Sequence, residues 1–176
     1  IPVGTGPMMT RVAAETADGL IMHPFSTEAY VKEVYVPTLD EHLTRVSLSR
    51  DDFIVDFSPL IATGDTEEAI DAARQVARER IAFYGSTRSY QRVLAHHGWE
   101  ALQPQLNTLM KQGRVEEMAA LIDDAVFDAF VVSGAPDDVG RELKRRYGNF
   151  IDRMTLSPEG LSERSLGSLI EQLKSA

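Results

Sequence analysis

Two glycines and a hydroxyl residue lie close to the start of the chain, in the order Gly4-Thr5-Gly6-Pro7-Met8. The proline and the apolar spacing that follows it predict a helix beginning at this point. Glycine lets backbone amides approach a bound anion, and the first turn of a helix adds a partial positive charge. The same sequence is also a common strand-to-helix turn, so these residue types leave anion binding and a purely structural role equally open.

His23, Pro24 and Phe25 directly follow the short apolar run Leu20 to Met22. A uniformly apolar run of this length is typical of a strand that is buried on both faces of a parallel sheet. Barrels of parallel strands carry their chemistry at the carboxyl ends of those strands. We therefore favour a binding role for His23, as a hydrogen-bond donor to a ligand oxygen, over a partly buried structural histidine. Phe25 is equally consistent with packing.

A polar and aromatic cluster that includes Tyr84, Ser86, Arg88 and Tyr90 lies at the end of a long predicted helix and at the start of the segment after it. An arginine at such a position can pair with an acidic ligand or cofactor tail. A solvated arginine is the commoner case, so residue type alone favours a surface role for Arg88.

Other residue types that support catalysis are absent or badly spaced. The chain has no cysteine, which excludes disulfides, thiolate metal sites and cysteine nucleophiles. His96 and His97 are adjacent, so on a helix their side chains point about 100° apart, and no His-Glu-x-x-His sequence accompanies them. We predict no metal site. No Gly-x-Ser-x-Gly turn or Walker loop supports a hydrolase or a kinase.

The composition is that of an ordinary globular domain. The chain has 176 residues, of which 43% are hydrophobic and 26% charged. No apolar run approaches the roughly 20 residues that span a bilayer, and no secretory signal is present, so a cytoplasmic location is expected. The net charge of -9 opposes binding to nucleic acid and to anionic membranes.

Short apolar runs alternate with amphipathic segments along most of the chain. Strands are predicted at residues 1–3, 20–22, 53–62 and 150–156, and helices at 7–17, 26–46, 66–84, 134–148 and 162–173. Residues 85–132 have a helical pattern without a strand signal and are predicted to form an inserted segment or lid. This alternation predicts an α/β fold with parallel strands and helical crossovers. Four strands are predicted, whereas a closed barrel has eight and about 250 residues.

Four stretches of sequence follow one another in a specific order. They are residues 1–9 (IPVGTGPMM), 17–21 (ADGLI), 62–69 (ATGDTEEA) and 133–139 (SGAPDDV). In this order they resemble the bacterial luciferase-like flavoproteins, and the resemblance covers nearly the whole chain. Residues 81–86 (IAFYGS) with 97–99 (HGW) are similar to the branch of that family that uses the deazaflavin coenzyme F420. Each stretch alone is unspecific, and the four together are specific.

The resemblance implies a (β/α)8 TIM barrel of which this chain is about the second half. The predicted strands would be strands 5–8, and residues 85–132 a helical insertion after strand 7, within one domain over 1–176. The first four strands, with much of the pocket and the catalytic residues, would be missing. Because the chain opens at Ile1 rather than Met, we expect it to be an excerpt. Such a half barrel exposes strand edges and is expected to dimerise or aggregate by itself.

The resemblance also implies an oxidoreductase that transfers hydride between coenzyme F420 and a small organic substrate. An FMN-dependent monooxygenase and a non-catalytic relative that binds flavin or a partner subunit are the alternatives. The expected protein partner is a second copy or the first half of the barrel. The implied cofactor-binding residues are Gly4, Thr5, Gly6, Pro7, Met8, His23, Pro24 and Phe25, and the implied substrate pocket includes Tyr84, Ser86 and Arg88.

Overall fold

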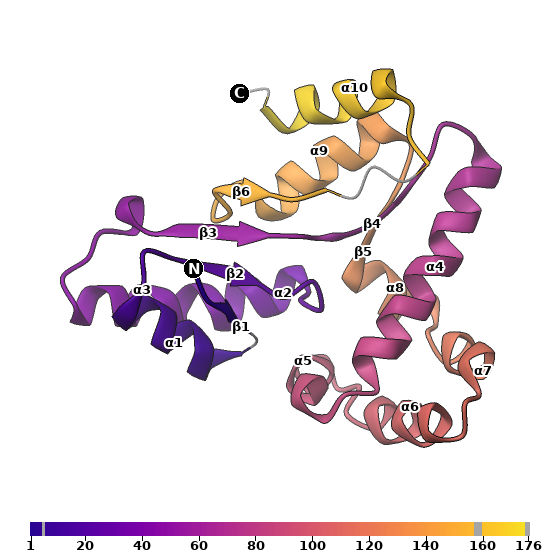
Figure 1. Ribbon diagram of the computed structural model, residues 1–176, viewed down its shortest axis with the longest axis horizontal. Coiled ribbons are helices and arrows are strands. Elements are labelled where there is room, and N and C mark those ends of the chain that lie inside the picture. Colours follow the sequence, from indigo (N-terminus) through magenta and orange to yellow (C-terminus); the bar gives the residue numbers. More distant parts are fainter. Residues whose placement is uncertain (5, 157–159, 175–176) are drawn as a thin grey trace.

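Parallel strands and helices alternate in the computed structural model, which describes residues 1–4, 6–156 and 160–174 (Figure 1). The strands are β1 (Val3–Gly4), β2 (Gly19–Met22), β3 (Ile54–Phe57), β4 (Leu60–Thr63), β5 (Val131–Gly134) and β6 (Arg153–Met154). The longer helices are α1 (Pro7–Thr16), α3 (Val36–Arg45), α4 (Glu67–Gly85), α6 (Leu102–Lys111), α9 (Pro136–Tyr147) and α10 (Glu163–Lys174). The shorter ones are α2 (Glu28–Tyr30), α5 (Gln91–His96), α7 (Val115–Ala120) and α8 (Asp124–Phe130).

All strand pairs among the described residues are parallel. Strands β1, β2, β3 and β6 form one sheet in that order, and β4 pairs with β5 in a second sheet. Within the first sheet, Gly4 is level with Met22, and Met22 is level with Phe57. The carboxyl ends of β1, β2 and β3 therefore lie side by side, so the loops that follow these strands share one edge of the sheet.

The strand predicted at residues 53–62 is two strands in the structure. Strands β3 and β4 are separated by Ser58 and Pro59, and β3 leads on into β4 (Figure 1). Proline has no amide hydrogen to donate to a strand ladder, which explains the interruption. The first part pairs with β2 and β6, whereas the second part pairs with β5, so the two parts contribute to different sheets.

Strand β5 was not predicted from the sequence. Val131 and Val132 were expected at the end of the helical segment, and Gly134 at the start of the next helix. In the structure Val131 is level with Leu60 and Gly134 with Thr63. Two consecutive β-branched valines suit a strand. A four-residue strand that directly follows the last residue of α8 is too short to show its own periodicity, which explains the error.

The second helical segment begins at Glu28, two residues later than predicted, and contains a π-helix. The Thr27 side chain caps α2 by accepting a hydrogen bond from the amide of Tyr30 at 3.1 Å. Residues Val31–Tyr35 form the π-helix η1, which ends shortly before Pro37. Proline lacks an amide hydrogen and clashes with the preceding helical turn, so a wider turn accommodates it within a continuous helix. The helical segment therefore continues through Pro37, with a change from α- to π-helical turns before it.

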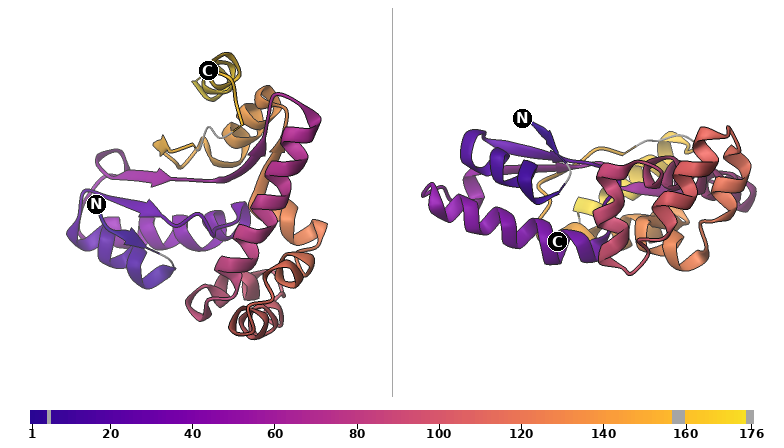
Figure 2. Two further views of the ribbon diagram at one scale, coloured as in Figure 1. Left: turned by 45° about the vertical axis from the view of Figure 1, so that its right-hand side comes forward. Right: turned by 90° about the horizontal axis from the view of Figure 1, so that it is seen from below.

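Helices cover the strands in groups that follow the chain. Helices α1 and α3 pack against each other, as do α9 and α10, and α4 leads from β4 to α5, α6 and α7 at its far end (Figure 2). One continuous core includes Phe25, Phe57, Phe130 and Tyr147. Within the described residues, no helix has the length and apolar character needed to cross a membrane.

Candidate functional site

His23 lies directly after β2, at the shared edge where the loops converge. Its Nδ1 accepts a hydrogen bond from the amide of Phe25 at 3.1 Å. The ring packs against Tyr90, with centroids 4.5 Å apart, and against the edge of Tyr84 at 4.8 Å. Burial among these rings lowers the pKa of His23 below its ordinary value of 6.5, because burial disfavours the charged imidazole.

Tyr90 connects the His23 loop to the segment that follows α4. It ends the short 3₁₀ helix η3 (Arg88–Tyr90), and its hydroxyl oxygen lies 3.1 Å from Nε2 of His23. Burial raises the pKa of Tyr90, so its hydroxyl stays protonated at neutral pH. Two regions that the sequence singled out, the loop after β2 and the polar cluster after α4, are thus in direct contact.

The turn between β1 and α1 lies next to His23. The amide of His23 donates a hydrogen bond to the Gly4 carbonyl at 3.4 Å. Gly6 precedes α1 with φ 79° and ψ 171°, a conformation that essentially only glycine adopts. Its amide donates to the Tyr35 hydroxyl at 3.0 Å. Thr5, the third residue singled out in this turn, lies outside the described residues.

The first turn of α1 has no side-chain cap at Gly6. Helix geometry leaves the amides of Met8 and Met9 without an acceptor inside the helix. Pro7 has no amide hydrogen, and the Met8 side chain is 74% exposed. The part of this turn that suits an anion is therefore the backbone of Met8 and Met9, because the Gly6 amide is engaged by Tyr35.

Arg92 lies against this turn, and sequence reasoning missed it. A β-carbon on Gly6 would lie 2.6 Å from Nη1 of Arg92, so the guanidinium fills the space left by the glycine hydrogen. Arg92 is exposed, and no described carboxylate pairs with it. The available signal in the sequence is its position two residues after Tyr90, the last residue of the polar and aromatic cluster.

The other predicted site residues differ in how exposed their side chains are and in whether those side chains already have partners. Phe25 is fully buried and stacks on Phe130 with centroids 4.4 Å apart, so it packs the core beneath the loop. Ser86 is also buried; its hydroxyl donates to the Phe83 carbonyl at 2.7 Å. Pro24 is partly buried, and Arg88 is exposed without an ion pair to any described residue. Of these four, Arg88 alone offers an unengaged polar side chain.

The two adjacent histidines connect the end of α5 to the loop after β2 and to the π-helix η1. Nε2 of His97 lies 2.7 Å from the Thr27 hydroxyl, and the His97 ring stacks on Trp99. Nε2 of His96 lies 3.1 Å from a carboxylate oxygen of Glu33. Within the described residues, no three side chains of metal-binding type form a cluster. The His97 contact therefore holds the helical segment against the loop that carries His23, and the His96 contact holds it against η1.

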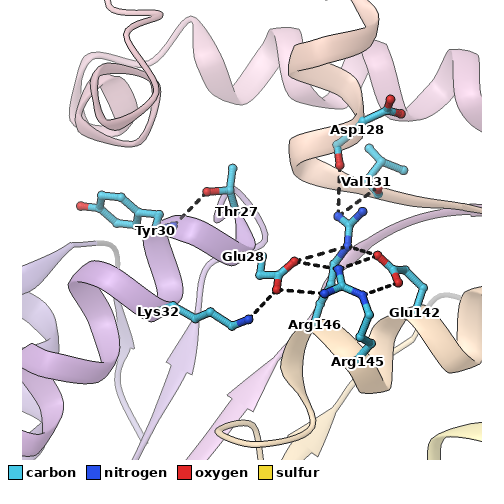
Figure 3. A network of polar contacts seen from close by, with 9 residues as sticks. All are labelled: Thr27, Glu28, Tyr30, Lys32, Asp128, Val131, Glu142, Arg145 and Arg146. Carbon is cyan, nitrogen blue, oxygen red and sulfur yellow. Dashed lines mark hydrogen bonds and ion pairs between the residues drawn. The ribbon is translucent and has the colours of Figure 1, made fainter.

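A network of ion pairs connects the start of α2 to α9 (Figure 3). The Glu28 carboxylate accepts hydrogen bonds from Lys32 at 2.6 Å and from Arg145 at 3.0 Å. Burial alone would raise the pKa of Glu28, but hydrogen bonds from Lys32 and Arg145 outweigh it and lower the pKa. Arg146 of α9 lies between Glu28 and Glu142 and donates to the Asp128 carbonyl at 3.1 Å. The network joins α2, α8 and α9.

The arrangement therefore places a neutral histidine, a protonated tyrosine, an arginine without a described carboxylate partner and a helix start at one edge of the sheet. The sequence profile of the luciferase-like monooxygenases matches residues 3–153. The chain belongs to the luciferase-like monooxygenase family. This membership confirms the family resemblance seen in the order of the four sequence stretches.

Two relatives share sequence with most of this chain. An uncharacterized protein of Mycobacterium tuberculosis, Rv1360, is 40% identical over 149 residues, which are 85% of this chain and 44% of that protein. A 5,10-methylenetetrahydromethanopterin reductase of Archaeoglobus fulgidus is 30% identical over 135 residues, 76% of this chain and 40% of the reductase. The chain spans less than half the length of either relative.

Solved structures confirm the predicted fold. The coenzyme F420-dependent tetrahydromethanopterin reductase from Methanopyrus kandleri has a TM-score of 0.72 and 19% identity, and the match covers 97% of this chain and 48% of that one. An F420-dependent secondary alcohol dehydrogenase, in complex with an F420-acetone adduct, has a TM-score of 0.60 and 15% identity over 97% of this chain and 46% of that one. The chain therefore has the fold of part of a luciferase-like (β/α)8 barrel.

Proposed function

We propose that this chain contributes to an oxidoreductase that binds coenzyme F420 and transfers hydride to or from an organic substrate. The observation that carries the proposal is the convergence of the turn before α1, His23, Tyr90 and Arg92 at the carboxyl ends of β1 and β2. The luciferase-like family and the relatives named for tetrahydromethanopterin reduction supply the reaction class. The deazaflavin ring, when bound, would supply the hydride chemistry, and the protein would bind and orient it.

The described residues fit the phosphate of such a cofactor. The amides of Met8 and Met9 lie at the positive end of α1 and have no acceptor in the helix. Arg92 adds a full positive charge beside Gly6. Glycine at positions 4 and 6 keeps the turn free of side chains; a β-carbon on Gly4 would lie 2.6 Å from the β-carbon of Met9. Backbone amides and a guanidinium are the donors that bind phosphate in proteins.

We propose further that residues 84–88 border the substrate. Tyr84 packs its ring against His23, and the exposed Arg88 is available to an acidic substrate group. Ser86 acts through its backbone, because its carbonyl accepts hydrogen bonds from Gln103 at 2.9 Å and Asn107 at 3.0 Å and so anchors α6. The helical segment 85–132 would then exclude water from the ring.

Cofactor titration tests the proposal. The protein, at its full encoded length, is titrated with coenzyme F420 and with FMN, and binding is followed by fluorescence. We expect submicromolar binding of coenzyme F420 and its loss in Gly6→Asp, which adds a negative charge beside the phosphate. Tighter binding of FMN would instead indicate a flavin monooxygenase. Binding of neither cofactor would refute the proposed function and leave the fold assignment unchanged.

A further inference from the structure

The partners of His23 determine which of its nitrogens carries the proton. The Phe25 amide can only donate a hydrogen bond, and it points at Nδ1 over 3.1 Å. Nδ1 must therefore be unprotonated. Turning the ring over would place carbon atoms opposite both the Phe25 amide and the Tyr90 hydroxyl, and both hydrogen bonds would be lost. The two contacts together fix the ring orientation.

A neutral imidazole that lacks a proton on Nδ1 carries it on Nε2. The lowered pKa of His23 keeps the ring neutral near pH 7. Nε2 therefore donates to the Tyr90 hydroxyl oxygen across the 3.1 Å contact. Tyr90 is the acceptor in this bond, so its own hydroxyl hydrogen remains available. No group in the described part of the chain accepts a hydrogen bond from it.

The surroundings of Tyr90 favour an anionic oxygen as the missing acceptor. Arg92 follows two residues later, carries a positive charge without a carboxylate partner among the described residues, and contacts Gly6. The amide of His23 is bonded to the Gly4 carbonyl, so the same turn lies beside the histidine. A hydroxyl donor and a guanidinium next to one turn together suit a phosphate or carboxylate group.

We propose that Tyr90 is a ligand-contacting residue whose hydroxyl donates a hydrogen bond to a phosphate oxygen of the cofactor. Arg92 supplies the neighbouring positive charge. His23 is a positioning residue that, by donating from Nε2, turns the Tyr90 hydrogen toward the ligand. This inference rests on the proposed function. It adds Tyr90, from the segment after α4, as a residue that recognises the phosphate.

The proton position on His23 is measured first. Long-range ¹⁵N–¹H correlation spectra of the ¹⁵N-labelled, cofactor-free protein at neutral pH distinguish the two neutral forms of the ring. We expect the His23 signal of the form protonated on Nε2. A proton on Nδ1 would make Tyr90 the donor to His23, leave no free hydroxyl hydrogen, and overturn the inference whatever the cofactor proves to be.

Binding then tests the phosphate contact. Three proteins are titrated: wild type, Tyr90→Phe and Tyr30→Phe. The ligands are each cofactor and its phosphate-free counterpart, which is riboflavin for FMN and the deazaflavin with an unphosphorylated ribityl chain for coenzyme F420. A neutral donor to a charged oxygen is worth about 10- to 100-fold in affinity. We expect Tyr90→Phe to lose that factor for the phosphorylated ligand only. Tyr30→Phe is the control: its hydroxyl bonds to no described residue, although burial raises its pKa and the charge of Arg92 opposes that shift, so this variant should lose less than Tyr90→Phe.

The remaining outcomes separate the alternatives. Equal losses for phosphorylated and phosphate-free ligands would place Tyr90 on the ring and overturn the phosphate contact. An unchanged cofactor affinity with a raised KM would assign the anionic oxygen to the substrate and likewise overturn it. If the wild-type protein binds neither cofactor, both the proposed function and the phosphate contact are refuted. If it binds and Tyr90→Phe binds equally well, the inference fails alone.

Discussion

The Tyr35 hydroxyl accepts a hydrogen bond from the Gly6 amide at 3.0 Å, and so connects the turn before α1 to the π-helix that ends at Tyr35. Tyr35 is almost fully buried, at 3% exposure. The π-helix places the tyrosine at this point, and Pro37 explains why a π-helix forms there. A feature of the second helical segment thus fixes the geometry of the glycine turn.

Removing this hydroxyl should destabilise the protein. Tyr35→Phe leaves the Gly6 amide without its acceptor in a buried place, which costs about 1–3 kcal/mol of unfolding free energy. The matched control is Tyr30→Phe, a second buried tyrosine at 3% exposure whose hydroxyl bonds to no described residue. Urea unfolding measures both variants. Equal unfolding free energies for the two variants would show that the Gly6 contact contributes no stability.

A side chain at Gly6 should be less tolerated than one at another glycine with positive φ. Gly6→Ala forces alanine into a conformation that costs about 1–3 kcal/mol and brings its β-carbon to 2.6 Å from Nη1 of Arg92. Gly113→Ala is the control, because Gly113 has φ 71° and no atom within 4 Å of an added β-carbon. There the cost should be about 1 kcal/mol.

Thermal unfolding compares the two alanine variants, and fluorescence titration measures their cofactor affinity. We expect only Gly6→Ala to weaken cofactor binding, since Arg92 must move away from the turn. A Gly6→Ala protein that is as stable as Gly113→Ala and binds cofactor normally would contradict the role assigned to the turn.

Site residues could be predicted where a nearby sequence pattern marks them, and could not where they join the site from a distant part of the chain. His23 was accessible because it directly follows a short apolar strand, whose carboxyl end is a known location for binding residues. Tyr35 and Arg92 contact the glycine turn only through tertiary folding, and no local pattern connects either residue with Gly6. The polar cluster after α4 was recognised, but its contact with His23 was not.

The hydrophobic pattern of the sequence was sufficient to predict part of the fold. Parallel alternation and four of the strand positions were recovered from apolar runs. The split at Pro59 and the additional strand β5 were not predicted. Strand β4 pairs with β5 in a second sheet, and the hydrophobic periodicity within each segment does not indicate which distant strand it pairs with. Ser86 illustrates the same limit: its type suggested a polar contact with a ligand, whereas its carbonyl and hydroxyl are both used inside the protein.

The ion pairs between α2 and α9 should contribute more than a pair on the surface (Figure 3). Glu28→Gln removes a carboxylate that accepts from Lys32 and Arg145 and is 24% exposed. We expect a loss of about 1–2 kcal/mol, since hydrogen bonds to charged groups are involved. Glu117→Gln breaks an exposed pair with Arg114 and should change the unfolding free energy by less than about 1 kcal/mol. Chemical unfolding at low and high salt checks both values.

The same network should make stability depend on pH in the acid range. A hydrogen bond from Arg145, opposed by burial and assisted by Arg146, lowers the pKa of Glu142 from 4.5 to about 2. The unfolded chain takes up this proton first as the pH falls, so the stabilisation present above pH 4.5 is lost progressively toward pH 2. Glu142→Gln should flatten that part of the curve of unfolding free energy against pH. An unchanged slope between pH 4.5 and 2 would contradict the assignment.

His23 should produce a separate loss of stability closer to neutral pH. Burial lowers its pKa in the folded protein below 6.5, so the unfolded state binds the proton first as the pH falls through 6.5. The stabilisation is complete above that pH and decreases below it, until the folded-state pKa is reached. His23→Asn keeps an acceptor for the Phe25 amide but does not titrate, so its unfolding free energy should fall less between pH 7 and pH 5. A direct NMR titration of the His23 ring provides the independent measurement, and a midpoint at or above 6.5 would contradict both the burial and the neutral ring on which the Tyr90 contact depends.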